Sequence, residues 1–400
     1  MKRDFIFISE SVTEGHPDKL CDQISDAIVD HFLEQDPFAR VRAECAVSTA
    51  ILFIAARLAS EVSVDLPNLA RQVISQNGYL DADFDARTCS ILTSIQELPF
   101  EMDCYFNEQN LTEEQMERIP VRQQVTVFGF ACDQTKAFMP LPIWLAHLLA
   151  RRINQARVQK LLPYLSPDAK TQVGVEFRNR KPYRIHSVTV IVSAAQPYLE
   201  ISPQRLHEDI REAVIYPAFA EEELRPDPDT RIFINPIENL MVGGPAVHSG
   251  LTGRKNAIDT YGEYARHSGS ALSGKDPLRI ERVGVYAARH AAKNLVAAGL
   301  AEECELQLSY SIGLSRPVSI QVETFGTGRL PDDELALCLE RHFDFRLAGI
   351  LRKFNLRHLP ALSNGNFYRR LAAYGQVGRL DLSLPWEATD TVQILQQYAD

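Results

Sequence analysis

The sequence lacks the features that mark membrane, secreted and nucleic-acid-binding proteins. It has no long apolar run, so no membrane-spanning helix is expected, and residues 1–5 lack the apolar core of a secretion signal. It also has no excess of positive charge. The 52 acidic and 42 basic side chains give a net charge of −10, which argues against nucleic acid as a general partner. We therefore expect a cytoplasmic protein that binds neither membranes nor nucleic acid.

Paired cysteine motifs are absent as well. The chain has seven cysteines, an odd number, and none of them forms a C-x-x-C pair. Neither a structural zinc site nor a disulfide framework is indicated, and reduced thiols are the simpler account. We also find no low-complexity tract and no internal sequence repeat.

The remaining pattern is that of a mixed globular protein. Four hundred residues are too many for one ordinary core, so two or three domains are expected. Hydrophobic periodicity predicts both strands and helices along the whole chain. The strands are expected at 46–54, 124–131 and 186–194, and the helices at 141–160, 283–298 and 332–343. Breaks are expected in the polar, irregular segments 98–118 and 225–231.

The most informative segment is residues 7–19, which read FISESVTEGHPDK. Pro17 suits the first position of a helix, and apolar residues recur at helical spacing from Leu20 onward. His16, Asp18 and Lys19 then lie at a helix N-terminus, which attracts anions. The histidine can donate to a phosphoryl or leaving oxygen, the lysine can neutralise phosphate, and the aspartate can hold a divalent metal. An N-terminal cap with solvated charges fits these residues equally well.

Two further loops favour the anion-binding interpretation. Residues 250–255 read GLTGRK, and residues 268–277 read SGSALSGKDP, with Arg279 and Glu281 just beyond. Glycine and serine let backbone N–H groups approach an anion closely. The second loop is not a Walker A motif, because Asp276 follows its lysine. Four basic residues within 26 positions of an acidic chain indicate a polyphosphate ligand; they are Arg254, Lys255, Lys275 and Arg279.

Together with further motifs, these segments make the chain similar to the S-adenosylmethionine synthetase (methionine adenosyltransferase) family over nearly its whole length. The other matching segments are 22–27, 166–173, 233–236, 243–245, 259–262, 287–289, 322–327, 373–375 and 385–387. The resemblance implies an α+β fold of three lobes with similar mixed sheet-and-helix topology, which we bound at 1–104, 119–238 and 239–398. It also implies a homodimer, or a dimer of dimers, whose active sites lie between subunits.

The chemistry that the resemblance implies is adenosyl transfer. In this family the thioether sulfur of methionine attacks the 5′-carbon of ATP and expels triphosphate, which is then cleaved to pyrophosphate and phosphate. The main catalytic requirement is electrostatic, because cations must stabilise the negative charge that develops on the leaving oxygen. Carried over by motif, His16 assists departure, and Asp18 and Glu281 hold Mg²⁺, while Glu44 falls at a K⁺ position. The triphosphate would be gripped by Lys19, Lys170, Arg254, Lys255, Lys275 and Arg279, and the nucleotide contacted by Asp168, Leu240, Ser273 and Gly274.

The residues that would bind methionine, the acceptor of the adenosyl group, depart from the family pattern. Arg57 follows Ala55-Ala56 where the family has Gly-Gly-Glu, Gln123 replaces a second carboxylate, and His248 stands where an aspartate is usual. Leu240 occupies the position of an aromatic residue that stacks on adenine. At the phosphate end, Glu281 replaces an aspartate and Arg279 a lysine, both with their charge kept. The triphosphate residues are therefore retained, whereas the usual methionine pocket, to which we assign Arg57, Gln123 and His248, is changed.

Three functions are compatible with the sequence. The first is a working adenosyltransferase that uses methionine or a related sulfur nucleophile. The second is a catalytically silent homologue that binds a nucleotide or regulates an active subunit. The third is a tripolyphosphatase or nucleotide triphosphate hydrolase that keeps only the second half-reaction. The intact set of His16, Asp18, Lys19, Lys170 and Lys275 favours an enzyme, because a purely structural partner has no physical need for it. The acceptor is not determined by the sequence.

Overall fold

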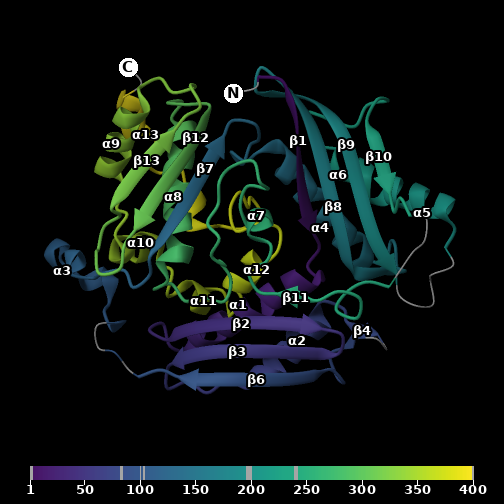
Figure 1. Cartoon of the computed structure of the whole chain (residues 1–400), viewed down its shortest axis with the longest axis horizontal. Helices are drawn as coiled ribbons and strands as arrows, with labels where there is room; N and C mark the ends of the chain where they lie inside the picture. Colours follow the sequence, from purple (N-terminus) through teal and green to yellow (C-terminus); the bar gives the residue numbers. More distant parts are fainter. Residues whose placement is uncertain are drawn as a thin grey trace.

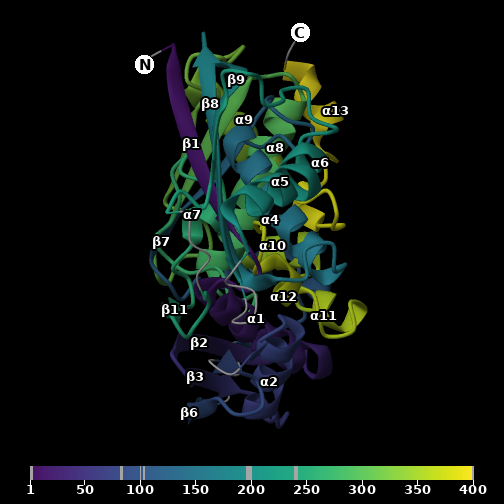
Figure 2. The ribbon, with the colours of Figure 1, turned by 90° about the vertical axis from the view of Figure 1, so that its right-hand side faces the viewer.

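The computed structural model describes residues 3–81, 84–99, 101, 104–194, 201–237 and 242–398. Three lobes surround a common centre, each built on one β-sheet (Figure 1). The side view places the large sheets on one side of the molecule and most of the helices on the other (Figure 2). The three-lobed α+β architecture that the family resemblance implies is confirmed.

The three sheets share one pairing scheme. In each, a lone strand lies antiparallel to the first strand of a hairpin, and in two of them a further strand runs parallel to the second hairpin strand. The first sheet has the order β11 (Gly250–Leu251), β2 (Arg40–Ser48), β3 (Ile51–Ala59), β6 (Ser90–Glu97). The second has the order β1 (Phe5–Val12), β8 (Leu165–Arg178), β9 (Lys181–Ala194), β10 (Arg231–Ile234). The third has the order β7 (Val125–Cys132), β12 (Glu303–Tyr310), β13 (Ser319–Glu323). A small ribbon pairs β4 (Leu80–Asp81) with β5 (Phe84–Asp85).

The lone strand of each sheet comes from another part of the chain. Strand β1 precedes the first hairpin in sequence but pairs with β8 of the second lobe. Strand β7 precedes the second hairpin but pairs with β12 of the third lobe, and β11 precedes the third hairpin but pairs with β2 of the first. The exchange is cyclic. The linear segments 1–104, 119–238 and 239–398 therefore each place their first strand in a neighbouring lobe.

One strand prediction was wrong. The apolar run 46–54 was expected to be a single strand, but the chain turns at residues 49–50, where Thr49 adopts a φ of 53°. The run is thus split between β2 and β3, which form a tight hairpin. The strands predicted at 124–131 and 186–194 are confirmed as β7 and as part of β9.

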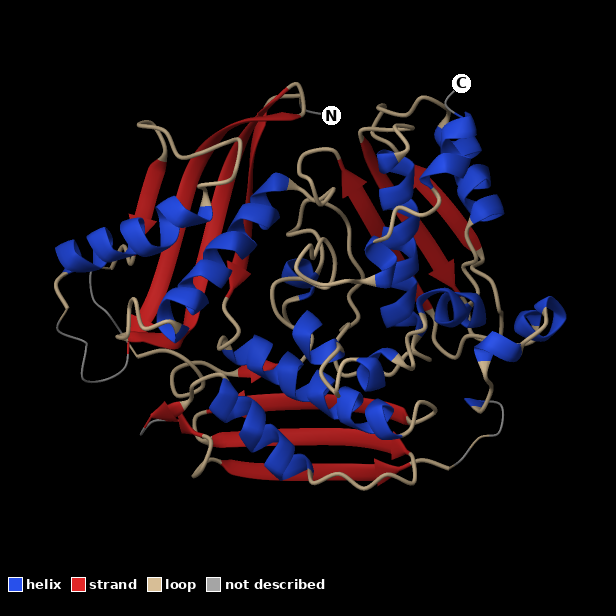
Figure 3. Cartoon of the chain, turned by 180° about the vertical axis from the view of Figure 1, so that it is seen from behind, coloured by secondary structure: helices blue, strands red, loops and turns tan. Residues whose placement is uncertain are grey.

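Helices cover one face of the sheets, as the view from behind shows (Figure 3). The predicted helices are confirmed as α4 (Leu141–Val158), α8 (Ile280–Ala297) and α9 (Asp332–His342), and α1 (Pro17–Gln35) begins at the predicted proline. α1 packs against β2, α4 against β8, and α8 against β7. The other helices are α2 (Leu66–Gln76), α3 (Glu113–Glu117), α5 (Pro203–Ile210), α6 (Tyr216–Ala218), α7 (Asn256–Asp259), α10 (Leu347–Phe354), α11 (Leu359–Leu362), α12 (Tyr368–Leu371) and α13 (Val392–Leu395). In the part of the chain that is described, no helix combines the length and apolarity needed to cross a membrane.

Two large apolar cores lie between the sheets and the helices. One is shared by the first and third lobes and includes Ile28, Val41 and Leu295, and the other fills the second lobe. All seven cysteines are buried and free.

The opposite face of the sheets carries exposed apolar side chains. In the first lobe these are Ile51, Phe53, Leu92 and Ile95, which are 42–54% exposed, and in the second Ile6, Ile8 and Ile191. On this side Figure 2 shows the outer strands of the sheets, and of the labelled helices only the short α7 is drawn there. We call it the open sheet face.

Candidate functional site

His16 caps the first helix from inside the protein. It is 2% exposed, and its Nδ1 accepts a hydrogen bond of 3.2 Å from the backbone N–H of Asp18. Burial lowers its pKa to about 3, against the partly compensating charge of Asp168. The ring is therefore neutral near pH 7, and since Nδ1 accepts, the proton lies on Nε2. His16 presents a hydrogen-bond donor to the site.

The loop that carries His16 is fixed to the end of the second lobe. Thr13 Oγ1 donates to the carbonyl of Pro167 at 2.7 Å, and the N–H of Ala169 donates back to Thr13 at 2.8 Å. Gly15 is required here, because a Cβ would lie 2.3 Å from Pro167 Cβ. These contacts hold His16 near Asp168, which is in the same segment as Pro167.

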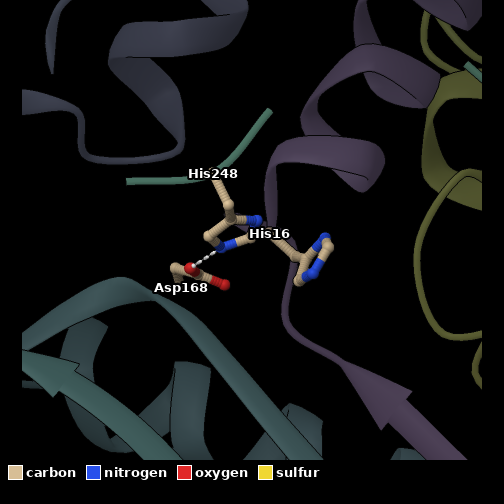
Figure 4. A group of neighbouring side chains, drawn as sticks. All are labelled: His16, Asp168 and His248. Carbon is tan, nitrogen blue, oxygen red and sulfur yellow. Dashed lines mark hydrogen bonds and ion pairs between the residues drawn. The ribbon is translucent and has the colours of Figure 1, made fainter. Parts of the chain in front are cut away.

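Asp168 and His248 form a pair beside His16 (Figure 4). His248 Nε2 lies 2.7 Å from Asp168 Oδ2, which also accepts the N–H of Gly244, and the two histidine rings are 5.0 Å apart between centroids. Burial alone would raise the pKa of Asp168, but the hydrogen bond from His248 and the nearby His16 hold it below its usual value. The ligand atoms of the three residues lie within 4.8 Å of one another, a spacing that a metal ion would tolerate. Because Nε2 of His16 carries the proton, we interpret the group as hydrogen-bonding rather than metal-binding.

Asp18 and the loop 250–255 complete this first cluster. Asp18 Oδ1 accepts from the N–H of Leu251 at 3.0 Å and lies 3.1 Å from Arg254 Nε, whereas Oδ2 is buried and has no hydrogen-bond partner among the described residues. Gly250 lets the loop lie against the start of α1, since a Cβ there would meet the carbonyl of Pro17 at 2.1 Å. We call the assembly the His16 cluster; it also holds Lys170 and Lys255, whose charges act on the His16 ring.

A second cluster surrounds Lys275, which is 5% exposed. Its ammonium lies 3.0 Å from Glu281 Oε1, while Glu281 Oε2 is buried and without a partner in the described chain. Burial lowers the pKa of Lys275, and Glu281 opposes that shift. Gly274, at a φ of +77°, lets its N–H reach Asp26 at 2.8 Å and its carbonyl reach Ala43. We call this the Lys275 cluster.

Residues at the start of α8 and on the first sheet belong to the Lys275 cluster. Arg279 caps α8, and Gln123 Oε1 accepts the N–H of Ile280 at 3.3 Å. Lys275 pairs with Arg42 as an isolated bridge, and Arg42 lies opposite Arg57 in the β2–β3 register. A hollow of about 270 Å³ is lined there by Arg42, Glu44, Ala55, Ala56, Arg57, Ser94 and Gln96. Ser273 is buried beside Gln376.

The two clusters lie at opposite ends of the same edge of β2. Leu251, which holds Asp18, is opposite Ala46, and Lys275 is opposite Arg42. Four residues of strand separate these anchors, or about 14 Å at roughly 3.4 Å per residue. The predicted acceptor residues are divided accordingly, with His248 in the His16 cluster and Arg57 and Gln123 in the Lys275 cluster. Leu240 lies outside the described residues.

Lys19 is placed differently from the other predicted cations. It is fully buried, with its ammonium 2.8 Å from Asp22 and in a short contact with Asp259. Burial alone would lower its pKa, but the two carboxylates hold the pKa above its usual value. Asp22 also accepts the N–H of Gly253 at 2.7 Å, so this network anchors the loop 250–255 from behind. Sequence reasoning missed Asp22 and Asp259 as the partners that decide the place of Lys19.

Comparison with known proteins covers almost the whole chain. Residues 4–99, 118–240 and 242–388 match the N-terminal, central and C-terminal domains of S-adenosylmethionine synthetase. Among similar proteins are those named S-adenosylmethionine synthase from Gloeothece citriformis, 44% identical over 99% of this chain and 97% of the relative, and from Thermosynechococcus vestitus, 46% identical over 99% and 98%. The protein of that name from Gloeobacter violaceus is 46% identical over 98% of this chain and 97% of its own length.

Proposed function

The chain belongs to the S-adenosylmethionine synthetase family, and on that premise we propose how its own residues transfer the adenosyl group of ATP to methionine. It is a transferase of the methionine adenosyltransferase type. The relatives give no support to a silent homologue or a tripolyphosphatase, since they are named as synthases.

The observation that carries the residue assignment is the neutral, buried His16 at the N-terminus of α1, among the cations of its cluster. In the reaction, a lone pair of the methionine sulfur forms the bond to C5′ as the C5′–O5′ bond breaks. The bonding electrons go to O5′ of the triphosphate, and sulfur becomes a sulfonium. His16 Nε2–H donates a hydrogen bond to O5′ as charge develops there, so no proton has to move. Lys170, Arg254 and Lys255 neutralise the phosphates beside it, and Lys275 and Arg279 do so in the second cluster.

A divalent cation fits the carboxylates of both clusters. Asp18 Oδ2 and Glu281 Oε2 are buried oxygens that lack a hydrogen-bond partner among the described residues, and carboxylate oxygen is what Mg²⁺ prefers. Mg²⁺ at these atoms would neutralise charge on the triphosphate. The K⁺ assignment at Glu44 does not fit as well, because Arg42 already binds its Oε1 at 2.7 and 3.0 Å.

The division of the residues into two clusters supports a homodimer. Each chain holds two half-sites, which lie about 14 Å apart along β2. One is the His16 cluster, and the other is the Lys275 cluster with Glu281, Arg57 and Gln123. Two chains that meet across the open sheet face would bury its apolar side chains and set the His16 cluster of one chain against the Lys275 cluster of the other. The acceptor residues Arg57, Gln123 and His248 would then meet between subunits.

The test is a product assay on the purified chain. ATP, Mg²⁺ and methionine should yield S-adenosylmethionine, pyrophosphate and phosphate, identified by mass spectrometry and a phosphate assay. A chelator should abolish the reaction and added Mg²⁺ should restore it. Turnover that survives chelation would refute the roles of Asp18 and Glu281, and phosphate release without an adenosylated product would refute the transferase assignment.

A further inference from the structure

A second basic cavity lies on the helix side of the molecule, away from the open sheet face. It measures about 260 Å³, and its lining includes residues of α1, α2 and α12. Figure 2 shows where these helices lie. Polar groups dominate its walls, among them Glu14, Gln76, Arg369, Arg370, Arg379 and Asp381. We call it the arginine hollow.

Two more arginines, both on α4, lie next to residues that line the hollow. Arg151 lies 3.0 Å from Asp381 and 5.3 Å from the ring of Tyr374, which lines the hollow. Arg157 faces the charge of Glu14. The Nε atoms of both arginines are buried and have no hydrogen-bond partner among the described residues.

The acids around the hollow do not balance these cations. Asp381 is occupied by Arg379, in a two-pronged ion pair of 2.8 and 2.9 Å, and by Arg151. Asp30 is occupied by the backbone N–H groups of Tyr368 and Arg369. Glu14 is the other acid among the described residues that line the hollow. Among the described residues, the five guanidinium groups of Arg151, Arg157, Arg369, Arg370 and Arg379 thus share the three carboxylates of Glu14, Asp30 and Asp381.

Burial makes this excess of positive charge unfavourable in free energy. It is the largest influence on the pKa of Arg151, Arg157 and Arg369 and lowers all three, so the nearby acids do not compensate for the loss of water. Guanidinium groups stay charged even so. An anion that enters the hollow would supply the missing counter-charge.

We propose that the arginine hollow binds a phosphate-type oxyanion, inorganic phosphate or pyrophosphate, at a site separate from the triphosphate residues. Guanidinium groups match phosphate oxygens in paired hydrogen bonds, and the side-chain amides of Gln76 and Asn366 add polar groups at the walls. The volume is below the roughly 300 Å³ at which sites for larger organic ligands begin, so a small ion suits it and a nucleotide does not. The reaction proposed above releases both ions, although binding in the hollow does not depend on that reaction.

The hollow lies directly behind the loop that carries His16. Glu14 is two residues before His16, and Gln23, another wall residue, donates to the carbonyl of Glu14 at 2.7 Å. Tyr79 donates to the carbonyl of Gly15 in the same loop. A bound anion would therefore sit on the opposite side of residues 13–16 from the catalytic residues.

The experiment measures binding of radiolabelled phosphate and pyrophosphate to the full chain at low salt. The variants are Arg369→Gln with Arg370→Gln, Lys275→Ala, and Arg205→Gln as a control on exposed α5. The double variant should lose one class of sites and keep the Lys275-dependent class and its circular dichroism spectrum. Lys275→Ala should do the reverse, and Arg205→Gln should bind as the unmodified protein does. If the double variant binds both ions as the unmodified protein does, the hollow is not an anion site.

A second variant guards against a general effect of removing two arginines. Asn366→Asp adds one negative charge at the exposed rim and removes no guanidinium group. It should weaken the hollow's affinity about fivefold, the effect of one unit charge at roughly 4 Å in water. Unchanged affinity in this variant would also overturn the proposal. Failure of Lys275→Ala to change binding would instead count against the triphosphate assignment, so the two conclusions fail separately.

Discussion

At the scale of single residues, burial decides what His16 does. Because its pKa lies near 3, the ring acts as a neutral donor and has no ionisation in the working pH range. His16→Asn removes the Nε2–H donor, since the shorter amide does not reach the same atom. We expect kcat to fall about 100-fold or more, the usual effect of losing one such donor, with little change in thermal stability. His31→Asn, on the same helix but with a ring that is 41% exposed, is the matched control.

The same pKa has a consequence for stability. An unfolded chain protonates His16 near pH 6.5, whereas the folded chain does so only near pH 3. The unfolded state therefore binds more protons below pH 6.5, and the free energy of unfolding should fall as the pH drops from 6.5 toward 3. Urea unfolding at several pH values should show a shallower decline for His16→Asn. An identical decline in both proteins would mean that the histidine is accessible to protons in the folded state.

The acceptor residues can be tested by reversing their charge. Arg57 lies opposite Arg42 in the hairpin, a like-charge pair that repels a substrate ammonium. The triple variant Arg57→Glu, Gln123→Asp and His248→Asp should raise kcat/KM for methionine by roughly tenfold, because it supplies carboxylates for the ammonium. Arg205→Glu with Gln155→Asp makes similar charge changes at exposed positions and should have no effect. If the unmodified chain already uses methionine efficiently and the variant loses activity, these residues suit methionine as they are.

The sequence revealed a site residue when its role depends on neighbours within a short motif, and not when it depends on a distant partner. His16, Asp18 and Lys275 stand in short motifs, and their polar side chains lie in the His16 and Lys275 clusters. Lys19 stands in the same motif, but its position is fixed by Asp259, which is 240 residues away. No local pattern tells a buried ion pair from a ligand-binding cation, so this distinction required the fold.

At the scale of elements, α1 is held in place by charges as well as by apolar packing. Lys19→Met should destabilise the protein by about 3–5 kcal/mol, because it leaves Asp22 and Asp259 buried without their counter-ion. Burial already raises the pKa of Asp22 to about 7 even with Lys19 present. Lys160→Met, at an exposed position after α4, should change the free energy of unfolding very little. A Lys19→Met protein with normal stability but no ATP turnover would return Lys19 to the triphosphate site.

Element prediction succeeded where periodicity is regular and failed where it is not. α4, α8 and α9 have clear apolar spacing and were predicted within a few residues. The turn at 49–50 contains only threonine and alanine and none of the usual turn residues glycine, proline, asparagine or aspartate, and the left-handed φ at a threonine is not a residue preference that sequence reveals. The hairpin that places Arg42 opposite Arg57 was missed for this reason.

At the scale of the whole molecule, the cyclic exchange of β1, β7 and β11 ties the lobes together. Each sheet receives its lone strand from a different segment of the chain than its hairpin. This pairing was not predictable from the sequence, because strand partners separated by well over a hundred residues leave no local pattern. It also means that the clusters form only once all three segments have folded together.

The arrangement of clusters leads to a complementation test for the proposed homodimer. His16→Asn and Lys275→Ala should each be almost inactive as pure proteins. If every active site takes its His16 cluster from one chain and its Lys275 cluster from the partner, a mixed dimer contains one intact site and one doubly defective site. Random reassortment of equal amounts makes half of the dimers mixed, so co-expression or mild denaturation and refolding should restore about one quarter of the unmodified activity. Mixing Lys275→Ala with Glu281→Gln, which alter the same cluster, should restore none and serves as the control. Absence of recovery in the first mixture, with mixed dimers demonstrated by differently tagged chains, would place both clusters of each site within one chain.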